Sequence, residues 1–423
     1  MTDVVRRVAR NAAWLAAGEG SVKGALFLTA VIVAHGAGPE GMGTFVIAYS
    51  AALLAVLVLA AGQQEVVIRE VAASPENADL LLRAARTVQN RLASWLVPTA
   101  MLATFLVHDQ SLRYSLLAFI PYSLLRAVLV THGAMFKGLD QMDMEVRART
   151  IEVVIVLLLL TASVFWCLEI WTVGIAFSVG AGAGLVWLRK GSRLLRKPES
   201  DPQKQTKDHQ ESSQFWRNLR LEGLPFLAIA VMAQLLLRAD TFLLAMLKVP
   251  RPEIGFYGAA GAPVWGIVAL PQLLSMSFYP TLSRRAAEKG KAWPAVVAAS
   301  AGGMALGLAL GVFLFIIRHP LVEIAFGPEF ERAVPLLSRL IWILPATVTM
   351  TFLGTVLAAW HRQKWSLGVL SAVLIVSFSL NLMWIPQHGP IGAATAAIWA
   401  HWFGVIILFA LTVRLLIVPR ETS

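Results

Sequence analysis

The sequence predicts an all-α integral membrane protein, and three observations carry this prediction. Hydrophobic residues make up 57% of the 423 residues, charged residues make up only 14%, and the mean hydropathy is +0.68. A soluble chain of ordinary composition carries about a quarter charged residues. The apolar residues fall in long runs rather than in the short alternating segments of a membrane β-barrel. The chain is therefore expected to cross a membrane repeatedly as helices.

About twelve runs are long enough to cross a bilayer core of roughly 30 Å as helices. The first run, Asn11 to Ala37, is apolar almost throughout but carries two charged residues near its middle. The twelve expected transmembrane helices span residues 11–37, 41–61, 86–107, 112–137, 150–167, 171–188, 221–247, 255–283, 293–317, 334–357, 365–384 and 391–417.

Lysine and arginine are distributed unevenly between the two sides of these spans. With the N-terminus placed inside and residues close to the ends of spans counted with the adjoining side, 26 of the 36 lie on the inner side and 5 on the outer side, while the other 5 lie within spans. Positive residues collect in the cytoplasmic loops of membrane proteins. Both termini are therefore predicted to be cytoplasmic.

The longest polar stretch divides the chain into two halves with six expected helices each. It runs from Arg189 to Arg220, is rich in charge and punctuated by proline, and is expected to be a flexible cytoplasmic linker. We therefore expect an N-terminal six-helix lobe over 1–190, a linker over 191–218 and a C-terminal six-helix lobe over 219–423.

The two halves echo one another after the first helix of each. The segment Pro39-Glu40-Gly41-Met42-Gly43-Thr44-Phe45 resembles Pro252-Glu253-Ile254-Gly255-Phe256-Tyr257, and one gap aligns Gly43 with Gly255. Chance similarity between two turn-rich loops is the alternative. The equal numbers of helices favour duplication, and repeated helix bundles are a transporter architecture.

Charged residues inside the expected spans are the candidate functional residues, because such residues are rare in membrane helices and face protein or a wet cavity. Glu19 and Lys23 lie four residues apart on one helix face, and a structural ion pair between helices is their alternative role. Arg126 lies midway along the fourth helix, and Arg238 and Asp240 lie in the outer part of the seventh. Lys23, Arg126 and Arg238 are the expected cavity cations. Glu19 and Asp240 are the two acids among the candidates.

Five further residues have weaker assignments. Glu152 and Arg91 lie near cytoplasmic ends of spans and Arg339 lies near an outer end, where long side chains extend to the interface. Trp265 and Gln272 lie mid-span on the eighth helix, where contact with a sugar and packing within the bundle are both open.

The sequence argues against several other classes of partner. The net charge of +11 comes from loops between apolar runs and forms no basic patch interleaved with aromatics, so no nucleic-acid partner is expected. The single cysteine, Cys167, cannot form an intrachain disulfide, and no metal-ligand cluster is present in the sequence, so no metal or cofactor is expected. The N-terminal run is too long and too charged for a cleavable signal peptide.

A series of short motifs runs along nearly the whole chain. They are Asn11-Ala12-Ala13-Trp14, Gly38-Pro39-Glu40-Gly41-Met42-Gly43-Thr44-Phe45, Ile68-Arg69-Glu70-Val71-Ala72, Arg238-Ala239-Asp240, Gly255-Phe256-Tyr257-Gly258-Ala259-Ala260, Tyr279-Pro280-Thr281-Leu282-Ser283-Arg284, Phe326-Gly327-Pro328-Glu329-Phe330, Asn381-Leu382-Met383-Trp384-Ile385-Pro386 and Gly389-Pro390-Ile391-Gly392-Ala393-Ala394. In order and spacing they resemble prokaryotic oligosaccharide flippases of the Wzx type, members of the multidrug/oligosaccharidyl-lipid/polysaccharide exporter superfamily.

This resemblance implies two pseudo-symmetric six-helix lobes around a central cationic cavity. It implies a transporter, not an enzyme, that moves a polyprenyl-pyrophosphate-linked oligosaccharide from the inner to the outer leaflet of a prokaryotic cytoplasmic (inner) membrane by alternating access. The process served would be cell-surface polysaccharide biosynthesis. Membrane lipid, a coupling ion (H⁺ or Na⁺) and other polysaccharide assembly proteins are the implied partners. In this reading, Glu19 and Asp240 hold the cavity cations when the cavity is empty or bind the coupling ion.

Two other functions stay open at this point. A multidrug or cation extruder of the same superfamily would favour carboxylates over cations in its cavity, whereas the candidates are three cations and two acids. A membrane glycan polymerase or ligase would place catalytic groups at the membrane edge or in sizeable outer loops. The longest expected outer loop, about 318–333, contains no paired carboxylates and no Ser/His/Asp arrangement.

Overall fold

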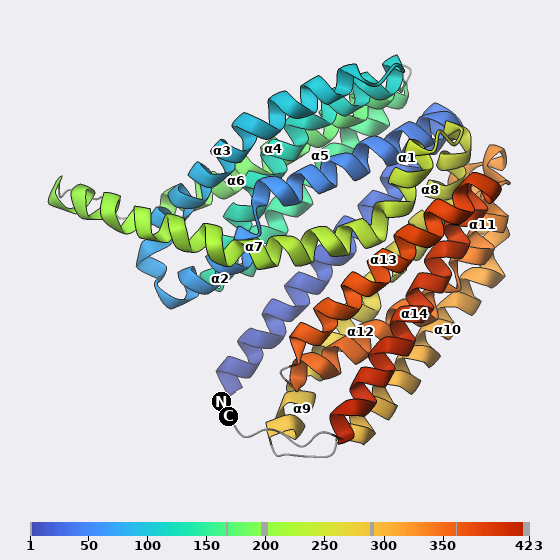
Figure 1. Cartoon of the computed structure of the whole chain (residues 1–423). Helices are drawn as coiled ribbons and strands as arrows, with labels where there is room; N and C mark the ends of the chain where they lie inside the picture. The colour runs from blue at the N-terminus through green and yellow to red at the C-terminus, as the bar shows by residue number, and fades with distance from the viewer. Residues whose placement is uncertain (1, 166–167, 196–201, 288–291, 361, 418–423) are drawn as a thin grey trace. The chain divides into compact units, whose positions relative to one another are not determined.

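The computed structural model describes residues 2–165, 168–195, 202–287, 292–360 and 362–417, and the regular structure of these residues is helical. Figure 1 shows the helices in chain order. Their bounds are α1 (Thr2–Ala60), α2 (Gln63–Ala73), η1 (Pro75–Asn77), α3 (Ala78–Phe105), α4 (Gln110–Gly138), α5 (Met142–Val164), α6 (Ile170–Leu195), α7 (Pro202–Met246), α8 (Arg251–Ile267), α9 (Ala269–Ala287), α10 (Ala292–Phe326), η2 (Pro328–Phe330), α11 (Ala333–Leu340), α12 (Ile343–Ala359), α13 (Gln363–His388) and α14 (Pro390–Ile417).

Within the described residues, each predicted span lies mostly on helix, which confirms the all-α membrane class. The first two spans are merged in α1, which bends at Gly38. There φ is +64°, a conformation that glycine adopts without strain, and Pro39 follows directly. The eighth span is divided between α8 and α9 and the tenth between α11 and α12, while α2 occupies a segment expected to be a loop.

Eight helices of the described part are long and apolar enough to cross a membrane by length and composition. α5 is not among them because charged side chains, including those of Glu145, Arg149 and Glu152, lie in its first three turns. Large apolar side chains that would be unfavourable in water remain exposed on the outsides of the helices. Examples are Ile316 (70%) and Ile324 (79%) on α10 and Ile406 (66%) on α14. Such a surface suits the hydrocarbon of a bilayer.

The chain divides into two compact units. Unit 1 comprises Met1–Gly36 and Ile47–Gln234, and unit 2 comprises Ala37–Val46 and Leu235–Ser423. The boundaries fall inside helices, because α1 contributes to both units and α7 passes from unit 1 into unit 2 at residue 235.

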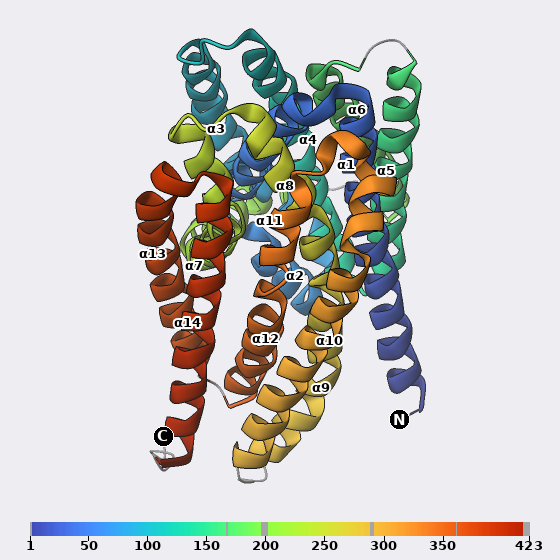
Figure 2. The same cartoon turned by 90° about the vertical axis from the view of Figure 1, so that its right-hand side faces the viewer.

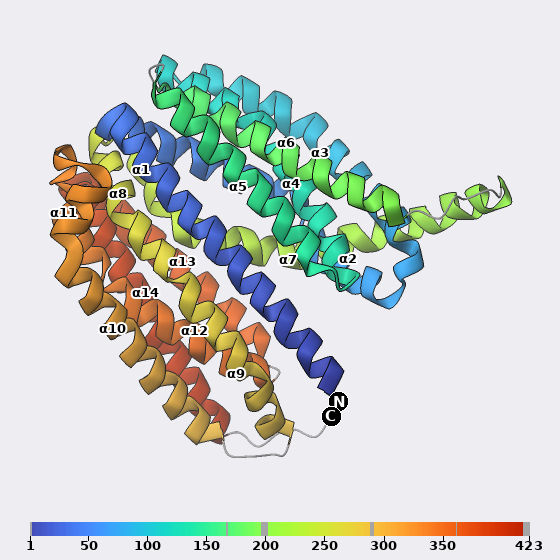
Figure 3. The same ribbon diagram turned by 180° about the vertical axis from the view of Figure 1, so that it is seen from behind.

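In unit 1, α4 packs against α5 and α6, and α2 and α3 pack against α4. Figure 3 shows α4, α5 and α6 side by side. α6 approaches α5 closely at Gly180 and Gly184, whose missing side chains face the backbone of Glu152 and Ala148. Small residues four apart favour such close packing of membrane helices. The apolar core of this unit includes Val66, Val67, Val71, Leu81, Phe136, Leu185 and Leu188.

In unit 2, α12 packs against α9, α10 and α14, and α13 packs against α14. Figure 2 shows α10, α12, α13 and α14 from the side. The apolar core between these helices includes Val296, Leu353, Val356, Leu357, Val373 and Leu408.

Two glycines bring α1 and α8 together inside unit 2. A Cβ atom on Gly43 would lie 2.1 Å from the carbonyl oxygen of Arg251, and one on Gly255 would lie 1.9 Å from that of Pro39. Only residues without a side chain allow these backbones to approach so closely. The contact is reciprocal and joins the two segments that echo one another in sequence. We call the contact of Gly43 and Gly255 with the opposite backbone the glycine joint.

The predicted flexible linker is helical over much of its length, so this expectation was wrong for residues 202–218. α7 begins at Pro202, and residues 196–201 lie outside the described part. Proline is favourable at the first position of a helix. Residues 203–220 contain neither glycine nor proline and are rich in glutamine, lysine and arginine, which are good helix formers. Low hydrophobicity argued against a packed core but did not exclude a helix.

Candidate functional site

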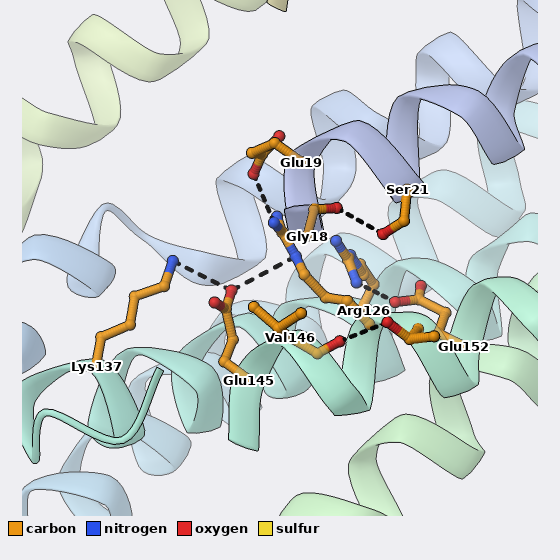
Figure 4. A network of polar contacts seen from close by, with 10 residues as sticks. Gly18, Glu19, Ser21, Arg126, Lys137, Glu145, Val146 and Glu152 are labelled. Atoms are coloured by element: carbon orange, nitrogen blue, oxygen red, sulfur yellow. Dashed lines mark hydrogen bonds and ion pairs between the residues drawn. The ribbon is translucent and has the colours of Figure 1, made fainter. Parts of the chain in front are cut away.

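A network of six charged side chains joins α1, α4 and α5 within unit 1 (Figure 4). Its members are Glu19, Arg126, Lys137, Glu145, Arg149 and Glu152. Three members are acids and three are bases, and each cation contacts at least one carboxylate. We call this set the unit 1 charge network.

The first part of the network lies beside the turn between α4 and α5. Arg149 donates from Nη1 to Glu19 at 2.5 Å, and its Nε lies 3.4 Å from Glu145. The Nζ atom of Lys137 lies 3.1 Å from the same Glu145 oxygen. α1 reaches α5 here because Gly18 offers no side chain, and a Cβ at that position would lie 3.0 Å from Val146.

The second part of the network lies deeper in the bundle. Arg126 donates from Nη1 to a carboxylate oxygen of Glu152. The side chains are 12% and 7% exposed, respectively. Arg126 precedes Lys137 by eleven residues, which is about 16 Å along a helix. A buried charge in an apolar bundle is tolerated when an opposite charge accompanies it.

The structure gives Glu19 a partner that the sequence analysis missed. Lys23 is half-buried and lies within electrostatic range of Glu19, but the ion pair joins Glu19 to Arg149. Arg149 was expected in the loop before the fifth span. Two features of the sequence would have predicted an earlier start of this helix. They are the acidic residues Asp143 and Glu145, which suit a first helical turn, and the spacing of four between Glu145 and Arg149.

The prediction that Glu152 extends toward the membrane interface was wrong. Glu152 is only 5% exposed and pairs with Arg126. α5 begins at Met142 rather than at residue 150, so Glu152 lies in the third turn of the helix and not at its end.

In unit 2, Asp240 is held by neutral donors. The hydroxyl of Tyr257 donates to one carboxylate oxygen, and the backbone N–H of Thr241 donates to the other at 2.7 Å. Asp240 is 6% exposed. Arg238 lies within electrostatic range of Asp240, but residues two apart on a helix are separated by about 200° around its axis.

The proposed sugar-contact residues also belong to unit 2. The ring of Trp265 lies 6.4 Å from that of His401 between centroids, so Trp265 makes a packing contact with α14. The side chain of Gln272 lies outside the part of the chain that is described.

Removing the Tyr257 hydroxyl is expected to destabilise the protein, because the buried Asp240 would lose a donor. We expect Tyr257→Phe to lower the free energy of unfolding by about 1.5 to 3 kcal/mol, the range for hydrogen bonds to charged groups. Thermal unfolding of the purified protein in detergent measures this. Tyr114→Phe is the matched control, because Tyr114 is 53% exposed. Equal melting temperatures for both variants would contradict the prediction.

The fold is shared with membrane transporters of the MOP superfamily. A structure of the lipid II flippase MurJ in an inward closed conformation matches 95% of this chain and 87% of its own, with 14% identity and a TM-score of 0.71. An inward-facing MATE-family multidrug resistance transporter matches 94% of each chain, with 12% identity and a TM-score of 0.76. A MOP-superfamily transporter from Pyrococcus furiosus, described as having a binding pocket of reverse polarity, matches 96% of each chain, with 13% identity and a TM-score of 0.62.

The family follows from the sequence match. Residues 8–286 match the model of the polysaccharide biosynthesis protein family. The chain belongs to this family. No curated protein matches it.

Proposed function

We propose that the protein is a flippase that moves a polyprenyl-pyrophosphate-linked oligosaccharide from the inner to the outer leaflet by alternating access. The observation that carries this proposal is Arg126, a cation deep in an apolar helix bundle and held by a single carboxylate contact. Membership of the polysaccharide biosynthesis protein family and the MOP transporter fold support the substrate class and the mode of action.

The chemistry of the substrate suits the cations of the chain. A pyrophosphate group in a bilayer needs charged donors, and these interact more strongly in a medium of low dielectric constant. In the proposal, Lys23, Arg126 and Arg238 are the residues that supply such donors. The carboxylates of the unit 1 charge network hold the cations while no substrate is bound.

Asp240 is the proposed site for a coupling ion in unit 2, H⁺ or Na⁺. Its hydrogen-bond partners are neutral, so a cation bound there meets no positive partner in direct contact. An inside-negative membrane potential would also favour outward movement of an anionic substrate, by about 2.3 kcal/mol per charge per 100 mV.

A cation extruder is the second candidate, and the same Asp240 favours it. A buried carboxylate without a direct basic partner is a binding site for an organic cation as well as for a proton. In unit 1, by contrast, the described acids of the network each contact a base, which favours an anionic substrate.

Reconstitution separates the two candidates. Purified protein in lipid vesicles is tested with a fluorescent disaccharide linked to undecaprenyl pyrophosphate, and an impermeant quencher reports which leaflet holds it. We expect faster transbilayer movement than in vesicles without protein. Uptake of tetraphenylphosphonium without movement of the lipid-linked disaccharide would instead establish the extruder. Movement that required cleavage of the glycan would point to an enzyme.

The proposed orientation in a prokaryotic cytoplasmic membrane makes a further prediction. In a Cys167→Ala background, a cysteine at Glu331 should react in intact cells with a membrane-impermeant maleimide, and one at Gln205 should react only after the cells are opened. The reason is the excess of lysine and arginine on the side that contains residue 205. The reverse labelling pattern would overturn the orientation.

A further inference from the structure

The ion pair between Arg126 and Glu152 uses one nitrogen of the guanidinium. Nη1 of Arg126 donates to Glu152, and the described part of the chain offers its Nε and Nη2 atoms no hydrogen bond. An arginine side chain carries five N–H donors in a planar fork. A carboxylate that accepted two parallel bonds would occupy one edge of this fork. Here the contact is with one nitrogen, so donors remain for a second anion.

Packed rings lie beside this pair. Tyr122 precedes Arg126 by one turn of α4, and both Tyr122 and Tyr49 lie within electrostatic range of the guanidinium. Neighbouring rings in the cluster have centroids 5.2 to 6.3 Å apart, and its members are Tyr49, Phe119, Tyr122 and Phe177. Such surroundings strengthen the attraction between the charges.

The backbone of Glu152 is fixed by α6. A Cβ atom on Gly180 would lie 2.6 Å from the carbonyl oxygen of Glu152, so the two helices are in direct backbone contact at this level. At this level α5 has no room to shift toward α6. The carboxylate of Glu152 therefore cannot withdraw from Arg126 in that direction.

We propose that Glu152 is a positioning residue that competes with the substrate pyrophosphate for Arg126. It holds the guanidinium by Nη1 and leaves the remaining donors for an incoming phosphate. It also neutralises the cation again when the substrate leaves, which speeds release. An arginine without this carboxylate would bind a phosphate too tightly to release it quickly. This inference rests on the proposed function, in which Arg126 contacts the pyrophosphate.

Glu152→Gln tests the proposal, because glutamine keeps the size and an acceptor oxygen but removes the charge. The assay is movement of the fluorescent undecaprenyl-pyrophosphate disaccharide in vesicles. We expect KM to fall about tenfold, which corresponds to about 1.4 kcal/mol of competition removed, and kcat to fall as release slows. Glu152→Asp keeps the charge and is expected to keep KM near that of the unmodified protein. A merely structural pair would lower stability and the active fraction in Glu152→Gln without lowering KM.

A charge swap keeps the proposal testable if Glu152→Gln does not fold. The double variant Arg126→Glu with Glu152→Arg preserves an ion pair between α4 and α5 but moves the cation to the other helix. We expect folded protein with a raised KM. Unmodified transport by the swapped protein, or an unchanged KM in folded Glu152→Gln, would overturn this inference while leaving the flippase function intact. Absence of movement of the probe lipid by the unmodified protein would overturn both.

Discussion

Gly255→Ala is expected to cost the protein about 3 kcal/mol of stability, at the upper end of the range for overpacking a close contact. The new Cβ would be placed 1.9 Å from the carbonyl oxygen of Pro39, a distance at which the backbones must separate. A backbone oxygen in a packed segment cannot rotate away as the end of a flexible side chain can. At about 2 to 4 °C per kcal/mol, the melting temperature should fall by roughly 10 °C.

The glycine joint offers an internal check on this result. Gly43→Ala should have a similar effect, because its Cβ would lie 2.1 Å from the oxygen of Arg251. The two losses should not add, since both separate the same pair of segments. Gly354→Ala is the control, because a Cβ there meets nothing within 4 Å. The measurement is thermal unfolding, in one detergent, of the unmodified protein, the three single variants and the double variant of Gly43→Ala with Gly255→Ala. A melting temperature unchanged by Gly255→Ala would show that the segments are not in close contact.

Lys23→Ala is expected to reduce transport of the lipid-linked disaccharide by about 10- to 100-fold, the loss for a hydrogen bond to a charged group. The ion pair between Arg149 and Glu19 simplifies the interpretation of this variant. Because Arg149 already pairs with Glu19, removal of Lys23 does not leave Glu19 as an uncompensated carboxylate. Folded protein is measured in parallel, so that a loss of transport is separated from a loss of structure. Lys23→Arg should retain part of the activity, since the charge survives while the geometry changes.

Two comparisons show whether Lys23 is a substrate cation or a structural charge. The double variant Glu19→Gln with Lys23→Met should remain inactive at normal membrane abundance if Lys23 contacts the pyrophosphate. Full activity of this variant would mean that the substrate's charge is met elsewhere, and Arg126 and Arg238 would be the next residues to test. Lys190→Ala, which removes an exposed lysine at the end of α6, controls for the change in net charge.

Hydropathy and charge were sufficient to locate the helices. Each apolar run of about twenty residues must satisfy its backbone hydrogen bonds internally, so its helical state follows from composition and length. Segments outside these runs were less predictable. α2 and the start of α7 are helical although their composition is polar, because helix propensity does not require hydrophobicity.

The sequence identified the candidate charged residues, but it did not show which of them form ion pairs with one another. Glu19, Lys23 and Arg126 were recognised because charged residues are costly in apolar runs. Arg149 was placed in a loop and Glu152 at the end of a span, because the start of α5 is charged and resembles a loop in composition. The helix begins eight residues before the predicted fifth span, which carries both residues into the bundle and beside α1 and α4.

The sequence by itself determined the class of this protein, the positions of its membrane helices and the set of residues too polar for their surroundings. These depend on local composition, which acts residue by residue along the chain. Only the tertiary structure decided that Arg149 holds Glu19, that Glu152 holds Arg126 and that Gly43 and Gly255 meet opposite backbones. Such pairs depend on distances between helices far apart in the chain, and close packing sets those distances.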